Sequence, residues 1–136
     1  MTQDTAPPAP VIALAPIRID IGPGELADRL SILELKVAHA PQETALVSAR
    51  DALAAQRARL PLPRLAEEVK LARVNADLWT AEDRIRSAER RGDYGPDFTA
   101  LARRIIALND RRSALKAAID RLAGGAVSTE IKIYDL

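Results

Sequence analysis

Acidic side chains recur beside the apolar stripes of the predicted helices, where they could do acid-base or metal chemistry. Glu25 and Asp28 lie three residues apart, so one face of a helix carries both carboxylates. Glu82 and Asp83 supply two more on a later helix. Carboxylates on facing helices can hold Mg²⁺ against a pyrophosphate, as helical phosphohydrolases do. However, Glu-x-x-Asp spacing is common on helices and no paired Glu-Glu-x-x-Glu run is present. We therefore predict no cofactor and no metal site, with Mg²⁺ bound by these four residues as the alternative.

A basic side chain interrupts the most regular apolar stripe of the chain. Arg112 stands between Leu108 and Leu115, at a position that a neighbouring helix should cover. An unpaired charge is costly there, so Arg112 should have a carboxylate partner. We expect that partner on the preceding helix, where three carboxylates are candidates: Glu82, Asp83 and Glu89. Two interpretations stay open for the polar residues beside these stripes. They could form separate salt bridges that fix helix register, or converge into one ligand pocket.

Four helices must position these side chains. Apolar residues recur at three- and four-residue spacing, and prolines and glycines separate the periodic stretches. The expected spans are residues 25–38, 42–59, 63–91 and 96–123. The last two helices are each nearly 30 residues long and only a short turn joins them. The sequence therefore predicts an all-α fold, an antiparallel helical bundle dominated by a long two-helix hairpin.

The two ends of the chain differ from its helical centre. Residues 1–16 are rich in proline and are expected to form a disordered tail, with residues 17–136 as a single helical domain. Residues 17–21 and 129–134 alternate apolar and polar side chains, as half-buried strands do. They could pair as a minor two-stranded β-ribbon, which would need to lie on the bundle because such a ribbon is marginal alone.

Composition excludes several classes of protein. The chain has 136 residues, 48% apolar and 29% charged, which suits one globular domain. It has no cysteine and one histidine, which excludes disulfides, thiolate sites and a histidine-based zinc site within one chain. A net charge of +1 and few aromatic residues make nucleic acid an unexpected partner. Since no apolar run could span a bilayer and no secretory signal is evident, we expect a cytoplasmic protein.

Four blocks of residues are distinctive as a set: Gly24–Lys36, Val74–Arg86, Leu101–Arg103 with Leu108–Arg112 and Lys116, and Glu130–Tyr134. Together they resemble an uncharacterised bacterial family, a domain of unknown function, over most of residues 17–136. The resemblance implies no established activity. Matched position by position, it implies the following motif residues: Glu25, Asp28, Lys36, Asn75, Trp79, Glu82, Asp83, Arg86, Asn109, Asp110, Lys116, Glu130, Lys132 and Tyr134. This sequence departs from the pattern at Ile131 and Ile133, where polar residues are expected, and at Arg29, where lysine is expected.

These residues and Arg112 form the candidate ligand-binding set. We expect a non-catalytic binding or interaction module whose polar cleft between helices takes an anionic small ligand or a partner protein. Arg86, Arg112, Lys36 and Lys116 would bind the anion, and Trp79 would form an apolar wall. One alternative is a Mg²⁺-dependent phosphohydrolase-like enzyme acting on a nucleotide or a sugar nucleotide. Another is a structural dimerisation module that forms a homodimer through the long hairpin.

Overall fold

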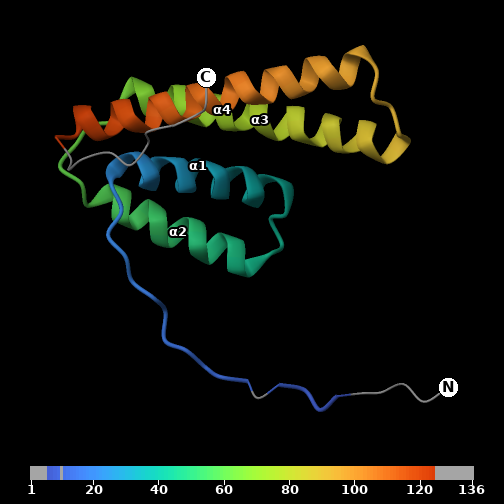
Figure 1. Cartoon of the computed structure of the whole chain (residues 1–136). Helices are drawn as coiled ribbons and strands as arrows, with labels where there is room; N and C mark the ends of the chain where they lie inside the picture. Colours follow the sequence, from blue (N-terminus) through green and yellow to red (C-terminus); the bar gives the residue numbers. More distant parts are fainter. Residues whose placement is uncertain (1–5, 10, 125–136) are drawn as a thin grey trace.

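The protein folds into four α-helices in a computed structural model, which describes residues 6–9 and 11–124. The helices are α1 (Pro23–His39), α2 (Thr44–Ala58), α3 (Ala66–Arg91) and α4 (Pro96–Leu122), as Figure 1 shows. The described part of the chain contains no strand. The predicted all-α fold is confirmed. The largest error in a helix boundary is at the start of α3, which begins at Ala66 instead of Pro63.

Proline and glycine set several of the helix ends. Pro23 and Pro96 occupy the first turns of α1 and α4, where a missing N–H costs nothing. Gly92 follows α3 with a φ of 68°, a left-handed conformation that favours glycine. At the start of α3, the backbone N–H of Leu65 donates to Glu68 Oε2 at 2.8 Å. Glu68 thereby satisfies one of the N–H groups that a helix start leaves without a partner.

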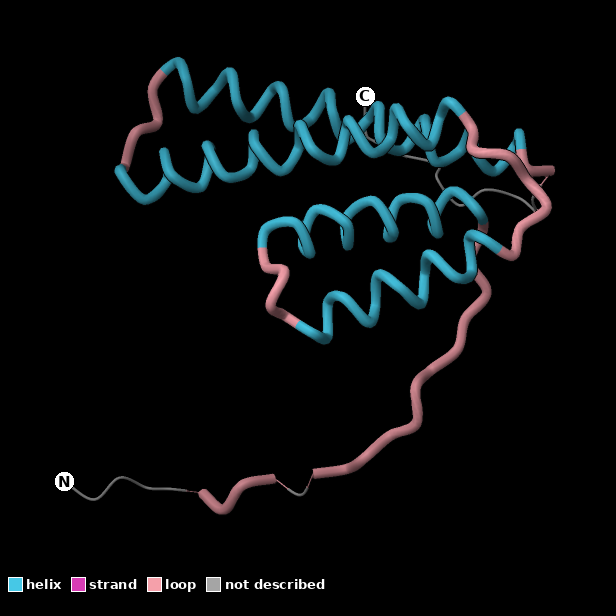
Figure 2. Tube along the Cα trace, turned by 180° about the vertical axis from the view of Figure 1, so that it is seen from behind, coloured by secondary structure: helices cyan, strands magenta, loops and turns pink. Residues whose placement is uncertain are grey.

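The helices are arranged as a long pair with a shorter pair beside it. α3 and α4 lie side by side, and α1 packs against both of them (Figures 1 and 2). Among the described helices, α2 packs closely along α1 alone and meets α3 only through a side-chain contact at its end. In both views the α3–α4 pair extends well beyond the loop that joins α1 to α2. The site described below therefore lies in the half of the long pair that α1 covers.

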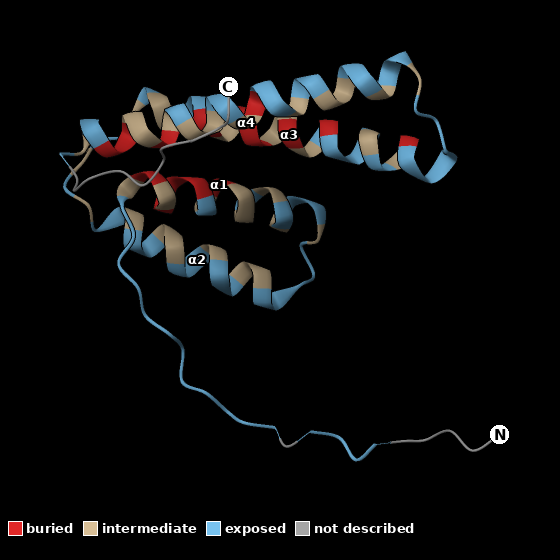
Figure 3. Cartoon of the chain, viewed as in Figure 1, coloured by how far each residue is buried: buried red, intermediate tan, exposed pale blue. Residues whose placement is uncertain are grey.

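Two apolar clusters hold the long pair and α1 together. Ala27, Leu71 and Ile119 join α1, α3 and α4, and a second cluster on the long pair contains Val74, Leu78 and Leu108. Leu115 packs against both clusters. In Figure 3 the buried residues lie on α1, α3 and α4, and α2 has no buried residue at all. α2 thus adds little to the core.

Residues 11–22, which lead into α1, are extended and exposed (Figure 1). The predicted strand at residues 17–21 is wrong, because these residues have no regular secondary structure. Alternating side chains produce a strand only when another strand supplies hydrogen bonds, and no described residue does so. The other half of the predicted ribbon, residues 129–134, lies outside the described residues. Among the helices that are described, none has the length and apolar character needed to cross a membrane.

Candidate functional site

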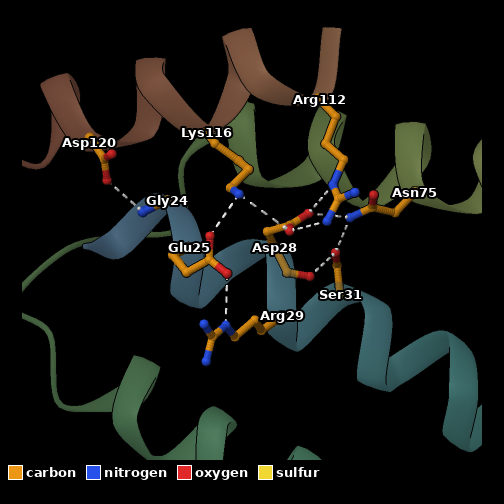
Figure 4. Close-up of polar contacts among 9 residues, drawn as sticks. All are labelled: Gly24, Glu25, Asp28, Arg29, Ser31, Asn75, Arg112, Lys116 and Asp120. Atoms are coloured by element: carbon orange, nitrogen blue, oxygen red, sulfur yellow. Dashed lines mark hydrogen bonds and ion pairs between the residues drawn. The ribbon is translucent and has the colours of Figure 1, made fainter. Parts of the chain in front are cut away.

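A buried carboxylate forms the centre of a polar cluster between α1, α3 and α4 (Figure 4). Asp28 on α1 is only 1% exposed. The guanidinium of Arg112 donates to both of its oxygens, from Nε to Oδ1 at 2.8 Å and from Nη2 to Oδ2 at 2.5 Å. Asn75 on α3 donates from Nδ2 to the same Oδ1 at 3.0 Å. One side chain of α1 thus holds both long helices, through a two-point contact that arginine forms especially well with a carboxylate.

Ser31 extends the cluster along α1. Asn75 Nδ2 also donates to Ser31 Oγ at 2.7 Å, and that hydroxyl donates to the backbone oxygen of Asp28 at 2.9 Å. The buried polar atoms of this part of the cluster therefore have hydrogen-bond partners, as buried polar groups require.

A second ion pair lies one turn closer to the start of α1. Lys116 on α4 places Nζ 2.7 Å from Glu25 Oε2 and 3.7 Å from Asp28 Oδ2. Arg29 donates from Nε to the other oxygen of Glu25 at 2.7 Å. Because the side chain of Lys116 is buried, these two carboxylates stabilise its positive charge away from bulk water.

The first turn of α1 is in close contact with α4. The backbone N–H of Gly24 donates to Asp120 Oδ1 at 2.8 Å, so a side chain of α4 caps α1. A Cβ at Gly24 would lie 2.3 Å from the backbone oxygen of Lys116. Only glycine permits this approach, which brings Glu25 and Asp28 within reach of the basic residues on α4.

Both central carboxyl groups have a pKa below the ordinary value. Burial raises the pKa of Asp28, but hydrogen bonds from Arg112 and Asn75 and the nearby positive charges outweigh it. Burial likewise raises the pKa of Glu25, and hydrogen bonds from Lys116 and Arg29 reverse the shift. Each carboxyl is therefore ionised at neutral pH, which suits an acceptor of ion pairs better than a proton donor.

Arg112 does not pair with the helix predicted to hold its partner. The expectation of a carboxylate on α3 is wrong, because Asp28 on α1 takes that place. In α3, the side chains that face α1 near Arg112 include the neutral amide of Asn75. The three candidate carboxylates, Glu82, Asp83 and Glu89, are instead exposed. The need for a carboxylate was inferred correctly, but the stripe of α4 could not show which of two neighbouring helices supplies it.

The structure brings together only part of the candidate ligand-binding set. The residues that meet in the cluster are Glu25, Asp28, Asn75, Arg112 and Lys116. Those that lie exposed on helix surfaces are Lys36, Glu82, Asp83, Arg86 and Asp110, and Asn109 is half-buried. Glu130, Lys132 and Tyr134 lie outside the described residues. Apart from these three and Trp79, the candidates thus divide into a hydrogen-bonded cluster and a set of side chains on the helix surfaces.

Trp79 lies on α3 and contacts the C-terminal end of α1, away from the ion pairs. Its ring stacks on that of His39, with 4.3 Å between ring centroids and 26° between planes. The indole N–H is buried and has no hydrogen-bond partner among the described residues. Trp79 therefore contacts the end of α1 through its ring and not through a hydrogen bond from its indole N–H, which is the usual polar contact of a buried tryptophan.

The four carboxylates considered as alternative Mg²⁺ ligands do not lie in one common environment. Glu25 and Asp28 are bound by Lys116 and Arg112 respectively, whereas Glu82 and Asp83 are exposed. Within residues 6–9 and 11–124, no three histidine or acidic side chains are arranged to hold a metal ion. A cation at Asp28 would have to compete with a guanidinium that already contacts both carboxylate oxygens.

A groove of about 400 Å³ lies between α1, α2 and the start of α3. Its apolar lining consists mainly of small side chains: Ala27, Leu30, Ala54, Ala58, Leu60, Leu62 and Ala72. Its polar lining is Ser31, Glu34, Arg57, Arg64 and Glu68. None of the candidate ligand-binding residues lines it. The available sequence signal was the weak apolar stripe of α2, which indicates a helix that packs on one side only.

An ion pair closes one end of this groove. Arg57 at the end of α2 donates from Nε to Glu68 Oε1 at 2.6 Å and from Nη2 to Glu68 Oε2 at 3.0 Å. The same guanidinium donates to the backbone oxygens of Leu62 and Pro63, at 3.3 Å and 2.9 Å. Although burial raises the pKa of Glu68, hydrogen bonds from Arg57 and Leu65 lower it overall. The link between α2 and α3 is thus well formed at this end.

Comparison with known proteins identifies the family of the chain. Neither curated proteins nor solved structures give a significant match. One family model matches residues 17–132, a span that includes all four helices and both the polar cluster and the groove. The chain belongs to a family of unknown function, DUF6165.

Proposed function

We propose that this domain is a non-catalytic protein-interaction module, and that its groove takes a short α-helix of a partner protein. The observation that carries the proposal is the one-sided packing of α2. That helix packs closely only against α1 and buries none of its residues, although α1, α3 and α4 share a core. A helix laid between α2 and α3 would cover the face of α2 that the domain itself leaves open.

The dimensions and side chains of the groove suit a helix. Its floor is one stripe of α1, from Ala27 to Glu34, about 11 Å long at 1.5 Å per residue. That length matches about two helical turns. Ala54 and Ala58 on one wall and Ala72 on the other are small enough for backbones to approach closely. Amphipathic helices that bind in grooves of this kind insert a few apolar side chains at three- and four-residue spacing.

Charges at the two ends of the groove favour a partner of mixed charge. Glu34 lies toward the open end, whereas Arg57, Arg64 and Glu68 gather where the chain passes from α2 into α3. We expect a basic residue of the partner beside Glu34 and an acidic residue beside Arg64. Such rim charges orient a bound helix more than they strengthen its binding.

The polar cluster supports a non-catalytic role. Its carboxylates accept hydrogen bonds or ion pairs from Arg112, Asn75 and Lys116, so these groups serve to hold α1 on the long pair. An anionic small ligand would have to displace Asp28 or Glu25 to reach the two basic side chains. The groove requires no such displacement.

Site-specific photo-cross-linking tests the proposal. A benzophenone amino acid would replace Ala54 in the groove, or Ala114 on the exposed face of α4 as the matched control, in cells that naturally produce the protein. We expect a discrete adduct from position 54 only. The cross-linked segment of the partner, made as a synthetic peptide, should then bind the purified domain.

Filling the groove should weaken that binding. Ala54→Leu extends an apolar side chain into the groove, and we expect it to reduce peptide affinity about tenfold or more, the loss that 1.4 kcal/mol represents. Ala114→Leu should leave affinity unchanged. The proposal would be overturned by equal adducts at both positions, by no adduct at position 54, or by equal affinity of the two leucine variants.

A further inference from the structure

The extended segment before α1 exposes apolar side chains at alternate positions. Ile17, Ile19 and Ile21 are 86%, 67% and 38% exposed, so burial increases toward the bundle. Arg18 and Asp20 alternate with them and are also exposed. Among the described residues, none forms a hydrogen bond with the backbone of residues 17–21. An unpaired extended segment of this kind is a template for pairing with another strand.

The order of these five residues is self-complementary. When two copies of residues 17–21 are placed antiparallel and centred on Ile19, Ile17 of each copy lies opposite Ile21 of the other. In the same register, Arg18 of each copy lies opposite Asp20 of the other. Every apolar residue thus meets an apolar residue and every charge meets its opposite, which is the pairing that stabilises neighbouring strands. A two-fold axis through Ile19 generates this arrangement, and two-fold symmetry is the commonest among protein oligomers.

We propose that residues 17–21 of two copies of this chain pair as an antiparallel β-ribbon and so join two helical bundles into a dimer. The occupant of the exposed segment is therefore the same segment of a second copy. Figure 1 shows this segment leading away from the helices, so a second copy can approach it without meeting the long pair.

An apolar surface lies where the proposed ribbon meets the bundle. A pocket of about 270 Å³ at the base of the segment is lined by Ile21, Leu26, Leu60, Leu62 and Ala123, among others. Ile17 of the second copy, placed opposite Ile21, would lie beside this pocket. A two-stranded ribbon is only marginally stable alone, and this apolar contact with each bundle supplies the packing that it needs.

Charge reversal provides a specific test, read out as molar mass by light scattering during gel filtration over a range of protein concentrations. The wild-type chain of 14.7 kDa should reach twice that mass. Arg18→Asp sets carboxylates opposite carboxylates twice in the symmetric dimer, and Asp20→Arg sets guanidinium groups opposite each other. We expect either variant to raise the dimer dissociation constant about tenfold or more. Both positions are exposed, so neither change should disturb the bundle.

A double variant and a mixture of the two single variants distinguish the proposed strand register from a general effect of charge. The double variant Arg18→Asp with Asp20→Arg restores every opposite pair and should dimerise like wild type. An equimolar mixture of the two single variants should form a heterodimer, although each alone is weakly associated. The proposal is refuted by a wild-type monomer at all concentrations, or by a dimer that charge reversal does not weaken. It is also refuted by single variants that do not recover on mixing. Ala54→Leu should leave the dimer intact, which separates this test from that of the groove.

Discussion

Replacing Asp28 by asparagine should show how strongly the polar cluster holds α1 on the long pair. The two side chains have nearly the same shape, so Asp28→Asn removes a negative charge and leaves little empty space. Arg112 loses its two-point partner, and the buried ammonium of Lys116 loses the nearby charge of Asp28 while its ion pair with Glu25 remains. The changed amide also places an N–H₂ group where guanidinium or Asn75 N–H groups already point.

The expected loss in the free energy of unfolding follows from how deeply Asp28 and Arg112 are buried. Breaking a buried ion pair by removing one member costs about 3–5 kcal/mol. Arg112 retains a side chain that is 31% exposed and can regain water, so we expect the lower part of that range, about 3 kcal/mol. A domain of this size unfolds with a free energy of about 5–15 kcal/mol. The melting temperature should therefore fall by roughly 10 °C.

Urea denaturation followed by circular dichroism measures this loss. Asp83→Asn is the matched control, since Asp83 is an exposed carboxylate on α3, and it should change the free energy of unfolding by less than about 0.5 kcal/mol. If Asp28→Asn cost no more than this control, the argument that Asp28 fastens α1 to α3 and α4 would be refuted.

The same variant should change how stability depends on pH. Because the pKa of Asp28 is lower in the folded protein, the unfolded chain binds more protons between the two pKa values, and stability rises with pH there. The stabilisation is complete above the unfolded pKa of about 3.9 and is lost as pH falls through the folded pKa. The gap between wild type and Asp28→Asn should thus be widest near neutral pH and narrow below about pH 4. A gap independent of pH would contradict this assignment.

Three further substitutions test separate contacts by the same denaturation assay. Gly24→Ala should cost about 1–3 kcal/mol, because its Cβ would lie 2.3 Å from the Lys116 oxygen, whereas Gly95→Ala, with its nearest atom at 3.4 Å, should cost less than about 1 kcal/mol. Glu68→Ala should cost about 1–3 kcal/mol through the lost bonds to Arg57 and Leu65, and Glu67→Ala should be nearly neutral. Trp79→Phe should cost about 1 kcal/mol or less, since the indole N–H has no partner among the described residues. A loss well above 2 kcal/mol would mean that this N–H is bonded in solution.

Hydrophobic periodicity was sufficient to predict the four helices, but not how they pack. The apolar stripes of α3 and α4 correctly indicated which face of each helix is covered. The interruption of the α4 stripe at Arg112 correctly indicated that this residue pairs with a carboxylate. Its partner could not be identified, because a stripe specifies which face of a helix is covered and not which helix covers it. The close approach at Gly24, which selects α1, depends on a backbone contact between residues far apart in the sequence.

The wrong strand at residues 17–21 and the unpredicted groove have different physical explanations. Residues 17–21 alternate like a strand, but a strand also needs a hydrogen-bonding neighbour, and no described residue of the same chain supplies one. The groove was missed because small side chains such as Ala54 and Ala72 give no periodic signal. Its shape arises because α2 packs closely along α1 alone and meets α3 only through Arg57, and that is a property of the assembled bundle.

The one-sided attachment of α2 implies that the domain does not open as a single unit. Because α2 has no buried side chain of its own, separating it from α1 disturbs less packing than separating α1 from the long pair, which would take the charged groups around Asp28 away from their partners. Local unfolding should therefore begin at α2, with its amide hydrogens exchanging faster than those of α1, α3 and α4. Such opening would widen the groove while the Asp28 cluster stays closed. A partner helix could then enter at a small fraction of the free energy needed to unfold the whole domain.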